Sequence, residues 1–394
     1  MTQVRVAGVG MVPFAKPSAG KHYEELAPAA IEAALADAGL DLADVRQVFA
    51  SYVYGDSTCG QAALYRLGMP GVPLVNVSNN CSSGSSALWL ARQAIVSREV
   101  DVALAFGFEE MRPGALVDHW TDRLSPVASF MARHDELYGV APAGTPGAAQ
   151  VFGAAGRAHQ ERFGTSAEAF ALISVKARRH AAANPYAVFR EEITLDEVLA
   201  SPQIYGPLTR LQCCPPTSGA AAVVLVSEEY AKRHGTAAKV RIAGQMLATD
   251  TETTFTGDAR QLVGYDIAVR AAEGAYAQAG IGPEDVPVVE LHDCFTANEL
   301  IAYEALGLTP EGTAEKFIVD GQNTHGGRVV TNPSGGLLSK GHPLGATGLA
   351  QCAELTWQLR GQAGDRQVEG AKVALQHNVG LGSACVVTVY ESVN

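Results

Sequence analysis

This sequence has no long apolar run and a deficit of basic residues, and each shortage excludes a class of protein. No continuous apolar stretch approaches the roughly 20 residues that a membrane-spanning helix needs, so no transmembrane span is expected. The amino terminus lacks the basic start and apolar segment of a signal peptide, so a cytoplasmic location is expected by default. The formal net charge of −12 argues against nucleic acid as the main partner, because phosphate binding needs a basic surface.

Cysteine is also scarce and irregularly spaced. The seven cysteines are an odd number without short regular spacing, which suits a reducing compartment and predicts no disulfide framework. The adjacent Cys213 and Cys214 lack a second pair at metal-ligand spacing, so no zinc site is expected. We interpret Cys59, Cys213, Cys214, Cys352 and Cys385 as buried structural thiols. Cys81 and Cys294 stand apart because of their surroundings.

What the sequence does contain is an internal duplication. Residues 4–8, Val-Arg-Val-Ala-Gly, recur at 240–244 as Val-Arg-Ile-Ala-Gly, and three further short matches follow in the same order. One of them aligns the turn at 81–84 with the turn at 342–345. Any single match arises by chance in an alanine-rich chain, but four in register favour a repeat.

Both copies alternate strand-like and helical segments. In the first copy we expect strands at 4–9, 48–53, 73–77, 102–106 and 218–227, with helices at 23–38 and 85–96. In the second copy the corresponding strands are expected at 240–245, 286–291, 373–376 and 386–390, with helices at 266–279 and 346–359. Short buried strands that alternate with helices predict a layered α/β architecture.

The duplication divides the chain into two halves and an insertion. The N-terminal half is expected at 1–112, completed by 210–235, and the C-terminal half at 236–394. The residues at 113–209 have no counterpart in the second copy and are expected to form an inserted loop domain. Their Pro- and Gly-rich loop and the helices that follow it suit a segment that covers a site.

Two turns at equivalent places in the copies carry a thiol and an imidazole. Cys81 lies in Cys-Ser-Ser-Gly at the start of an expected helix, and His342 lies in His-Pro-Leu-Gly at the start of another. Cysteine is nucleophilic as its thiolate, and the positive end of a helix dipole together with a nearby histidine favours that form. We therefore expect a cysteine enzyme; a buried structural cysteine is the alternative for Cys81 taken alone.

Two further polar segments follow expected strands. His292 and Cys294 lie just after the strand at 286–291, where sites form in open α/β sheets. Core packing or a metal half-site is the alternative, and no second ligand pair supports the metal. The segment Gln-His-Asn-Val-Gly at 376–380 offers a backbone N–H and a polar side chain, or else is a tight turn. The glycines of 335–348 fit neither a P-loop nor a dinucleotide fingerprint.

Four segments in this order resemble the active-site motifs of the thiolases, and of the sterol-carrier-protein type in particular. They are Asn-Asn-Cys-Ser-Ser-Gly at 79–84, His-Asp-Cys-Phe at 292–295, Gly-His-Pro-Leu-Gly at 341–345 and His-Asn-Val-Gly at 377–380. The resemblance implies a thiolase fold, in which two duplicated βαβαβαββ halves form a five-layer αβαβα arrangement and an inserted loop domain covers CoA. It also implies a homodimer or a homotetramer. Because the sequence stops just after the last expected strand, no appended sterol-carrier domain is expected.

The resemblance further implies Claisen chemistry on 3-oxoacyl-CoA, with CoA as co-substrate and no permanently bound cofactor or metal. Cys81 would be the nucleophile, His342 its activator, and Cys294 the group that protonates the departing enolate. His292 and His342 would hold the thioester oxygen, while the backbone N–H groups of Cys81 and Gly380 would hold the other oxyanion. The commoner thiolases have Cys-x-Gly where this chain has Asn-Val-Gly at 378–380, so Cys294 would supply the missing thiol.

Predicted substrate contacts and competing functions complete the expectations. Asn378 is a candidate substrate contact, and the candidates for the CoA phosphates are Lys176, Arg178, Arg179 and Arg210, each of which has a solvated helix charge as its alternative. Three other functions compete: a decarboxylating 3-oxoacyl synthase, a retro-aldolase on the same scaffold, and a non-catalytic acyl-CoA or lipid-binding subunit. A synthase has no need of Cys294 as a proton carrier, a retro-aldolase has no need of an acylated Cys81, and a binding subunit has no need of reactive groups.

Overall fold

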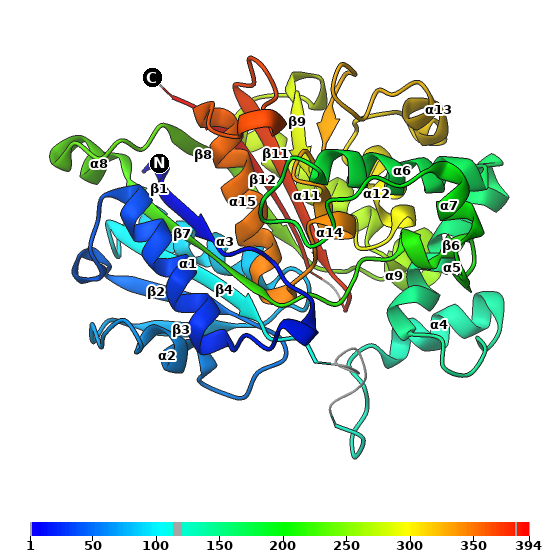
Figure 1. Ribbon diagram of the computed structural model, residues 1–394, viewed down its shortest axis with the longest axis horizontal. Coiled ribbons are helices and arrows are strands. Elements are labelled where there is room, and N and C mark those ends of the chain that lie inside the picture. Colours follow the sequence, from blue (N-terminus) through cyan, green and yellow to red (C-terminus); the bar gives the residue numbers. More distant parts are fainter. Residues whose placement is uncertain (1, 113–119, 383, 394) are drawn as a thin grey trace.

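The computed structural model describes residues 2–112, 120–382 and 384–393, and residues 113–119 at the start of the expected insertion lie outside it. A sheet of ten strands runs through the molecule in the order β10-β9-β11-β12-β8-β1-β7-β4-β2-β3, with helices on both of its faces (Figure 1). A second sheet pairs β5 (Gln203–Tyr205) with β6 (Leu208–Thr209). Within the described ranges, none of the helices combines the length and the hydropathy that a membrane crossing requires.

The two halves of the large sheet have the same topology. The first half contains β1 (Val4–Met11), β2 (Gln47–Ser51), β3 (Leu74–Val77), β4 (Val102–Glu109) and β7 (Gly219–Ser227). The second half contains β8 (Val240–Ala248), β9 (Val288–Glu290), β10 (Val330–Thr331), β11 (Val373–Gly380) and β12 (Ala384–Ser392). In each half three strands pair in parallel, and the remaining two pair antiparallel. The structure thus shows the duplication that the sequence predicts.

The halves are joined through their first strands. β1 and β8 pair antiparallel, with Arg5 opposite Arg241 and Val6 opposite Val240. Each of these strands would otherwise be a free edge with unpaired backbone groups, so their pairing satisfies both edges at once. The sequence predicts two separate halves but gives no sign of this junction, which makes them one continuous sheet.

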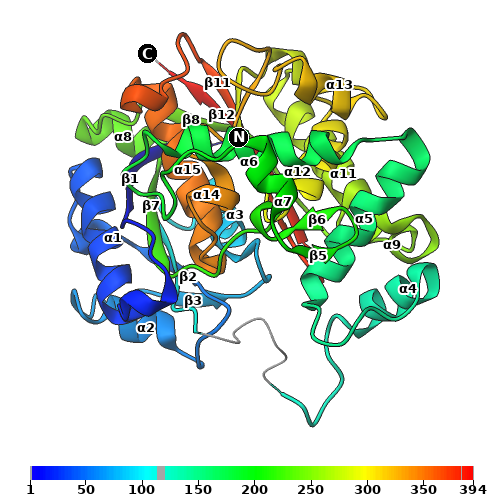
Figure 2. The ribbon, with the colours of Figure 1, turned by 45° about the vertical axis from the view of Figure 1, so that its right-hand side comes forward.

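Helices form three layers around the two half-sheets. α1 (Tyr23–Ala38) covers β1 and β7, and α11 (Tyr265–Ala279) covers β8 and β12. α3 (Ser83–Val96) and α15 (Leu344–Arg360) contact each other and lie between the half-sheets, α3 against β4 and α15 against both β7 and β11 (Figure 2).

The alternation of side chains along the strands confirms that both faces of the sheet are covered. On β4, Leu104 and Phe106 belong to the core under α1, while Ala103 and Ala105 belong to the core around α3 and α15. Successive side chains of a strand point to opposite faces, so a strand buried on both faces reads as a continuous apolar run. The small alanines on the inner face leave room for two closely packed helices.

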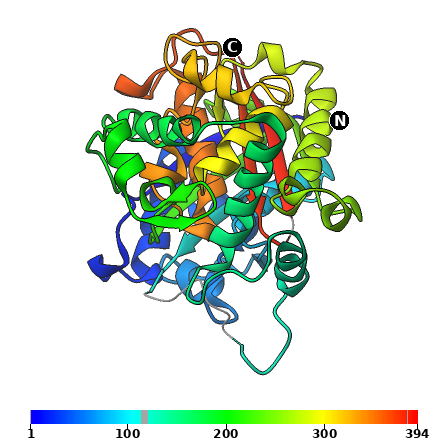
Figure 3. The same cartoon turned by 90° about the vertical axis from the view of Figure 1, so that its right-hand side faces the viewer.

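The segment between β4 and β7 packs mainly on the C-terminal half. Its helices are α4 (Ala128–Tyr138), α5 (Gly147–Phe163), α6 (Ala167–Ala181) and α7 (Leu195–Ala200). α5 and α6 both contact α12 (Thr296–Ala305), and Figure 3 shows these green helices in front on that side of the molecule. The remaining helices are short: α2 (Cys59–Leu64), α8 (Glu228–His234), α9 (Thr253–Thr256), α10 (Ala259–Leu262), α13 (Ala314–Val319) and α14 (Gly336–Ser339).

Candidate active site

The two central helices approach each other at their amino-terminal ends through glycine. A Cβ atom on Gly84 would lie 2.8 Å from the carbonyl oxygen of Gly345, and one on Gly348 would lie 2.3 Å from the backbone nitrogen of Ser85. Real Cβ atoms do not come this close to backbone atoms, so only glycine permits the crossing. The turns that precede the two helices are thereby brought together.

The crossing places three of the expected groups around one point. The sulfur of Cys81 and one ring nitrogen each of His292 and His342 all lie within 4.8 Å of one another. Cys81 comes from the turn before α3, His292 from the segment after β9, and His342 from the turn before α15. The thiol and the imidazole from opposite halves therefore meet, as the duplication predicts.

Cys81 is a neutral thiol at rest. Burial raises its pKa to about 12, and the nearby Glu109 carboxylate adds to the rise, while the backbone N–H groups of Cys81 and Leu381 act in the opposite direction. The sequence suggests a thiolate favoured by the helix dipole and a histidine. In the folded site the loss of hydration outweighs those effects, so a base must accept the proton when the sulfur attacks.

His342 has the arrangement of such a base. Its Nδ1 lies 2.7 Å from the hydroxyl of Thr347, and that hydroxyl donates its single hydrogen to the carbonyl oxygen of Pro343 at 3.0 Å. The hydroxyl therefore accepts from Nδ1–H, which leaves a lone pair on Nε2. Nε2 has no hydrogen-bond partner within the described ranges. Burial lowers the pKa of His342 to about 3, so the ring is neutral at rest and its Nε2 lone pair carries no proton.

His292 is held in the opposite sense. The amide nitrogen of Asn378 lies 3.0 Å from its Nδ1, and an amide nitrogen only donates, so Nδ1 carries the lone pair and Nε2 the proton. Nε2 of His292 also lacks a partner among the described residues. The two rings are nearly perpendicular, with centroids 5.1 Å apart. Burial and the neighbouring His342 and His377 lower the pKa of His292 well below its usual value, which keeps this ring neutral too.

Cys294 has a second thiol beside it. It is 4 % exposed, and its pKa is raised well above the usual range by burial and by interaction with Cys214, Cys81 and Asp293. The backbone N–H of Cys214 donates to the carbonyl oxygen of Cys294 at 2.9 Å. Cys214 thus lies beside Cys294 at the site, and it also packs against the hydrophobic core. Its loop also pairs Pro216 with His342, a tertiary contact that no local pattern reveals.

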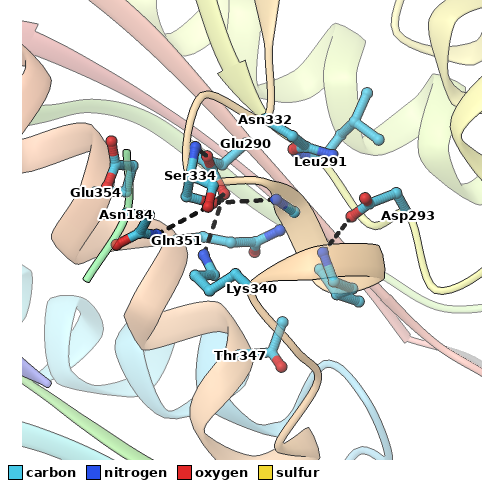
Figure 4. A network of polar contacts seen from close by, with 12 residues as sticks. Asn184, Glu290, Leu291, Asp293, Asn332, Ser334, Lys340, Thr347, Gln351 and Glu354 are labelled. Carbon is cyan, nitrogen blue, oxygen red and sulfur yellow. Dashed lines mark hydrogen bonds and ion pairs between the residues drawn. The ribbon is translucent and has the colours of Figure 1, made fainter. Parts of the chain in front are cut away.

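Buried carboxylates fix the segment that leads to His342 (Figure 4). Glu290 accepts from the backbone N–H and the hydroxyl of Ser334 at 3.0 and 2.8 Å, and forms an ion pair with Lys340 at 3.3 Å. Asp293 accepts from the backbone N–H of Leu337 at 2.7 Å. Glu290 and Asp293 lie on either side of His292 in the chain. Their contacts therefore fix the position of the His292 segment relative to the segment that precedes His342.

A second clamp holds the other side of His342 to the first half. The N–H of Gly345 donates to Glu109 at 3.0 Å, and its carbonyl oxygen accepts from the hydroxyl of Ser51 at 2.7 Å. Glu109 also accepts from the N–H of Tyr54 at 2.8 Å and of Val53 at 3.2 Å. Burial raises the pKa of Glu109 to about 7, although these N–H groups favour its ionised form.

Gly380 lies against the turn of Cys81. A Cβ atom at this position would be 2.2 Å from the carbonyl oxygen of Asn79 and 3.1 Å from the nitrogen of Ser82, so the close approach depends on glycine. This places the two backbone segments of the expected oxyanion site beside each other. The donation by the Gly380 N–H to substrate stays a prediction.

The candidate substrate contacts lie in different surroundings. Asn378 is fully buried and contacts His292 and Ser85, so its place is behind the site. Lys176 is only 6 % exposed and pairs with Glu299, which corrects its expected role, because a buried paired ammonium is not free to meet phosphates. The guanidinium of Arg178 stacks 4.2 Å from the ring centroid of Phe189. Arg179 and Arg210 are exposed.

Distance alone would let Cys81, His292 and His342 hold a metal ion. The donor set argues against it. To bind a metal through Nε2, His292 needs a lone pair on that nitrogen, but the Asn378 amide places the proton there. A metal on Nε2 would leave the ring hydrogen on Nδ1, where it would face the NH₂ group of Asn378. The geometry favours a hydrogen-bond donor at this position.

Two family descriptions match the chain, "Thiolase, N-terminal domain" over residues 4–229 and "Thiolase C-terminal domain-like" over residues 248–392. Sterol carrier protein 2 of Gallus gallus is 52% identical over 392 residues, which cover 98% of this chain and 71% of that protein. A solved structure of an Ltp2-ChsH2(DUF35) aldolase has a TM-score of 0.81 and 26% identity, covering 99% of this chain and 98% of that one. Human mitochondrial 3-ketoacyl-CoA thiolase in complex with CoA has a TM-score of 0.75 and 20% identity, covering 100% and 98%, and shows the shared fold.

Proposed function

This chain belongs to the thiolase family, and from that premise we propose how its own residues carry out the reaction. The chain is an acyltransferase that forms or cleaves 3-oxoacyl-CoA by Claisen chemistry, through an acyl-cysteine intermediate. The proposal assigns the nucleophile to Cys81, its base to His342, the proton carrier to Cys294 and oxyanion contacts to His292 and Gly380. CoA is the co-substrate.

In the cleavage direction, the first step is attack by Cys81 on the 3-keto carbon. The resting thiol and the resting imidazole are both neutral, so the proton moves from Sγ to Nε2 of His342 as the carbon–sulfur bond forms. The bond between C2 and C3 then breaks, and its electron pair leaves with acetyl-CoA as an enolate. The acyl group remains on Cys81 as a thioester.

Hydrogen-bond donors stabilise the negative charge that develops. Nε2–H of His292 is free to donate to the thioester oxygen of the enolate, and the newly protonated Nε2 of His342 is a second donor. The backbone N–H groups of Cys81 and Gly380 suit the oxygen of the tetrahedral intermediate. Removal of one such preorganised donor typically costs about 3 to 4 kcal/mol of transition-state stabilisation.

Cys294 completes the step by protonating C2 of the enolate. Burial and neighbouring groups raise its pKa well above the usual range, so Cys294 holds its proton until a strong base such as an enolate arrives. A second CoA then attacks the acyl-Cys81 thioester, and its thiol proton restores the Cys294 thiol. As acyl-CoA leaves, the freed sulfur of Cys81 takes back the proton from Nε2 of His342, and the site returns to its resting state.

The observation that carries this proposal is the meeting of Cys81, His292 and His342 from three separate parts of the chain within 4.8 Å. The test is CoA-dependent cleavage of acetoacetyl-CoA and of longer or 2-methyl-branched 3-oxoacyl-CoAs, followed through the half-reactions. Cys81→Ala is expected to abolish both the acyl adduct and cleavage.

Cys294→Ala separates the two half-reactions. It is expected to permit acyl transfer from a simple thioester onto Cys81 while it slows cleavage by about 10² to 10⁴-fold, the usual contribution of a general acid or base. Cys352→Ala, which removes a buried thiol in the middle of α15, is the matched control and is expected to retain both. Unimpaired cleavage in Cys294→Ala removes Cys294 from the mechanism.

The likeness to an aldolase structure makes carbon–carbon cleavage without acyl transfer the second candidate. A retro-aldol reaction needs no acyl-cysteine, so it would survive in Cys81→Ala and leave no adduct. Measurement of cleavage and of the acyl adduct in Cys81→Ala therefore decides between the acyltransferase and the aldolase. Coverage of CoA by the insertion at 113–209, phosphate contacts from Arg178, Arg179 or Arg210, a cytoplasmic location and a homodimer or homotetramer stay predictions.

A further inference from the structure

A continuous chain of buried side chains leads from β12, an interior strand of the C-terminal half-sheet, to the active site. The hydroxyl of Tyr390 donates to Oε1 of Gln376, and Nε2 of Gln376 donates to the hydroxyl of Ser85 at 2.8 Å. The Ser85 hydroxyl donates to Oδ1 of Asn378 at 2.8 Å, and Nδ2 of Asn378 meets Nδ1 of His292 at 3.0 Å. All five side chains are at most 1 % exposed, so water does not compete for these contacts.

We propose that Ser85 and Gln376 are positioning residues that act through Asn378 to keep the proton of His292 on Nε2, where it faces the substrate. The proposal rests on the proposed thiolase function, because it explains how one of two similar imidazoles becomes the oxyanion donor. Neither residue touches the reacting atoms.

The polarity of the chain is set by a backbone carbonyl. Nε2 of Gln376 also donates to the carbonyl oxygen of Gly348 at 2.7 Å, and a carbonyl oxygen only accepts. If the Gln376 amide were reversed, its own oxygen would face that carbonyl oxygen, and the Tyr390 hydroxyl would lose its acceptor. The orientation of Gln376 is therefore fixed from two sides.

Each later member of the chain follows from the one before. The Ser85 hydroxyl receives a hydrogen from Gln376 and has one hydrogen of its own, which goes to Asn378. The Asn378 oxygen is thus directed to Ser85, and its NH₂ group is directed to His292. Nδ1 of His292 can then only accept, so the neutral ring must carry its hydrogen on Nε2.

The other tautomer would disturb the whole chain. A hydrogen on Nδ1 would face the NH₂ group of Asn378, and a reversal of Asn378 would turn that group toward Ser85. Ser85 would then receive two donors and would have to turn its own hydrogen away from both. Fully connected buried networks resist such partial reversal, because each unpaired polar group is left without water.

The neighbouring imidazole shows the opposite arrangement. Thr347 accepts from Nδ1–H of His342 and leaves a lone pair on Nε2, whereas Asn378 donates to Nδ1 of His292 and leaves a hydrogen on Nε2. Two histidines that face the same sulfur are thus made into a base and a donor by the groups behind them. The different residues at 347 and 378, rather than the rings, decide which is which.

Asn378→Asp provides the sharpest test, because it keeps the size of the side chain and reverses its polarity. A carboxylate accepts from Nδ1–H, so the lone pair of His292 would move to Nε2 and the substrate would lose a donor. We expect exchange of the C2 hydrogens of acetyl-CoA with deuterated water, which requires the enolate, to fall at least about 100-fold. Acetylation of Cys81, which uses the backbone donors, is expected to stay within about threefold.

Ser85→Ala removes the link between Gln376 and Asn378, and we expect a smaller fall in C2 exchange, about 3- to 30-fold, with acetylation again retained. Ser227→Ala is the matched control, since Ser227 is a buried serine that lies directly before α8 and contacts Asp101 rather than any residue of the site. We expect both reactions to be unchanged in it. Exchange and acetylation that fall together in Asn378→Asp, or an unchanged exchange, would overturn the proposal.

Nitrogen-15 NMR of the histidine-labelled protein reads the tautomer without activity. The His292 signals are identified by their loss in His292→Asn. We expect a protonated Nε2 in the wild-type protein and a protonated Nδ1 in Asn378→Asp. A protonated Nδ1 in the wild-type protein refutes the inference even if the variants do not fold. Absence of both reactions in a wild-type protein with the expected tautomer would instead refute the proposed function.

Discussion

Replacement of Thr347 by valine tests how His342 becomes a base. Valine has the shape of threonine but no hydroxyl, so Nδ1–H of His342 loses the acceptor that it has at 2.7 Å. The hydrogen is then free to move to Nε2, which removes the lone pair that accepts the proton of Cys81. We expect Thr347→Val to fold and to bind acetyl-CoA, but to acetylate Cys81 slowly.

The magnitude follows from burial of the lost contact. His342 is 5 % exposed and Thr347 is 1 % exposed, so water does not replace the hydroxyl. A buried donor left without its partner costs about 1 to 3 kcal/mol, and each 1.4 kcal/mol corresponds to a factor of ten. The expected loss in the rate of acetylation is therefore about 5- to 150-fold.

The assay is single-turnover release of CoA from acetyl-CoA, with urea unfolding as the measure of stability. Thr347→Ser keeps the hydroxyl and loses only a methyl group, and we expect its rate to stay within a few-fold of the wild-type rate. The reasoning is refuted if Thr347→Val reacts within twofold of the wild-type protein. It is refuted equally if Thr347→Ser is as slow as Thr347→Val, because packing would then explain the loss.

Two further predictions concern the clamp between the halves. The pKa of Glu109 rises from 4.5 to about 7, so its contribution to stability is present below about pH 4.5 and is lost as the pH rises through about 7. Glu109→Gln keeps the neutral form, and its free energy of unfolding should fall less steeply over that range in urea titrations; equal slopes would contradict this. In Gly107→Ala the new Cβ would lie 2.1 Å from the carbonyl oxygen of Gly345, so we expect a loss of about 1 to 3 kcal/mol and slower acetylation. Gly147→Ala, whose nearest neighbour would be 3.6 Å away, is its control, and similar losses in both variants would show that the crossing is not special.

Local patterns predict the elements whose ends are set locally. The helix expected at 23–38 is α1 (Tyr23–Ala38), because apolar residues recur at helical spacing and Gly39 ends it with a φ of 63°. The strand expected at 286–291 is shorter, as β9 (Val288–Glu290). Leu291 leaves the ladder because its N–H donates to the side chain of Asn332, a partner that the local sequence does not show.

The residues of the site likewise fall into those that the sequence predicts and those that it does not. Cys81, His292 and His342 are predictable because they lie at a strand end or at helix starts and form part of motifs. Glu109 and Ser85 are not, since Glu109 acts on a residue 236 positions away and Ser85 on one 293 positions away.

Burial explains two of the expectations that the structure corrects. The thiolate expected at Cys81 is outweighed by desolvation of the thiol, which raises its pKa to about 12. Lys176, a candidate contact for the CoA phosphates, is instead buried in an ion pair with Glu299. A residue's own segment does not predict how much water the fold leaves around it, so both corrections require the assembled halves.

The most direct test of the central claim compares the acetylation of Cys81 in the wild-type protein and in His342→Ala. Each protein is mixed with acetyl-CoA and quenched at intervals, and the modified peptides are identified and quantified by mass spectrometry. We expect the acetyl group on Cys81 in the wild-type protein, and a rate about 10² to 10⁴-fold lower in His342→Ala, since the thiol then has no base. An adduct on another residue, or equal rates in the two proteins, would contradict the pairing of a nucleophile from one half with a base from the other.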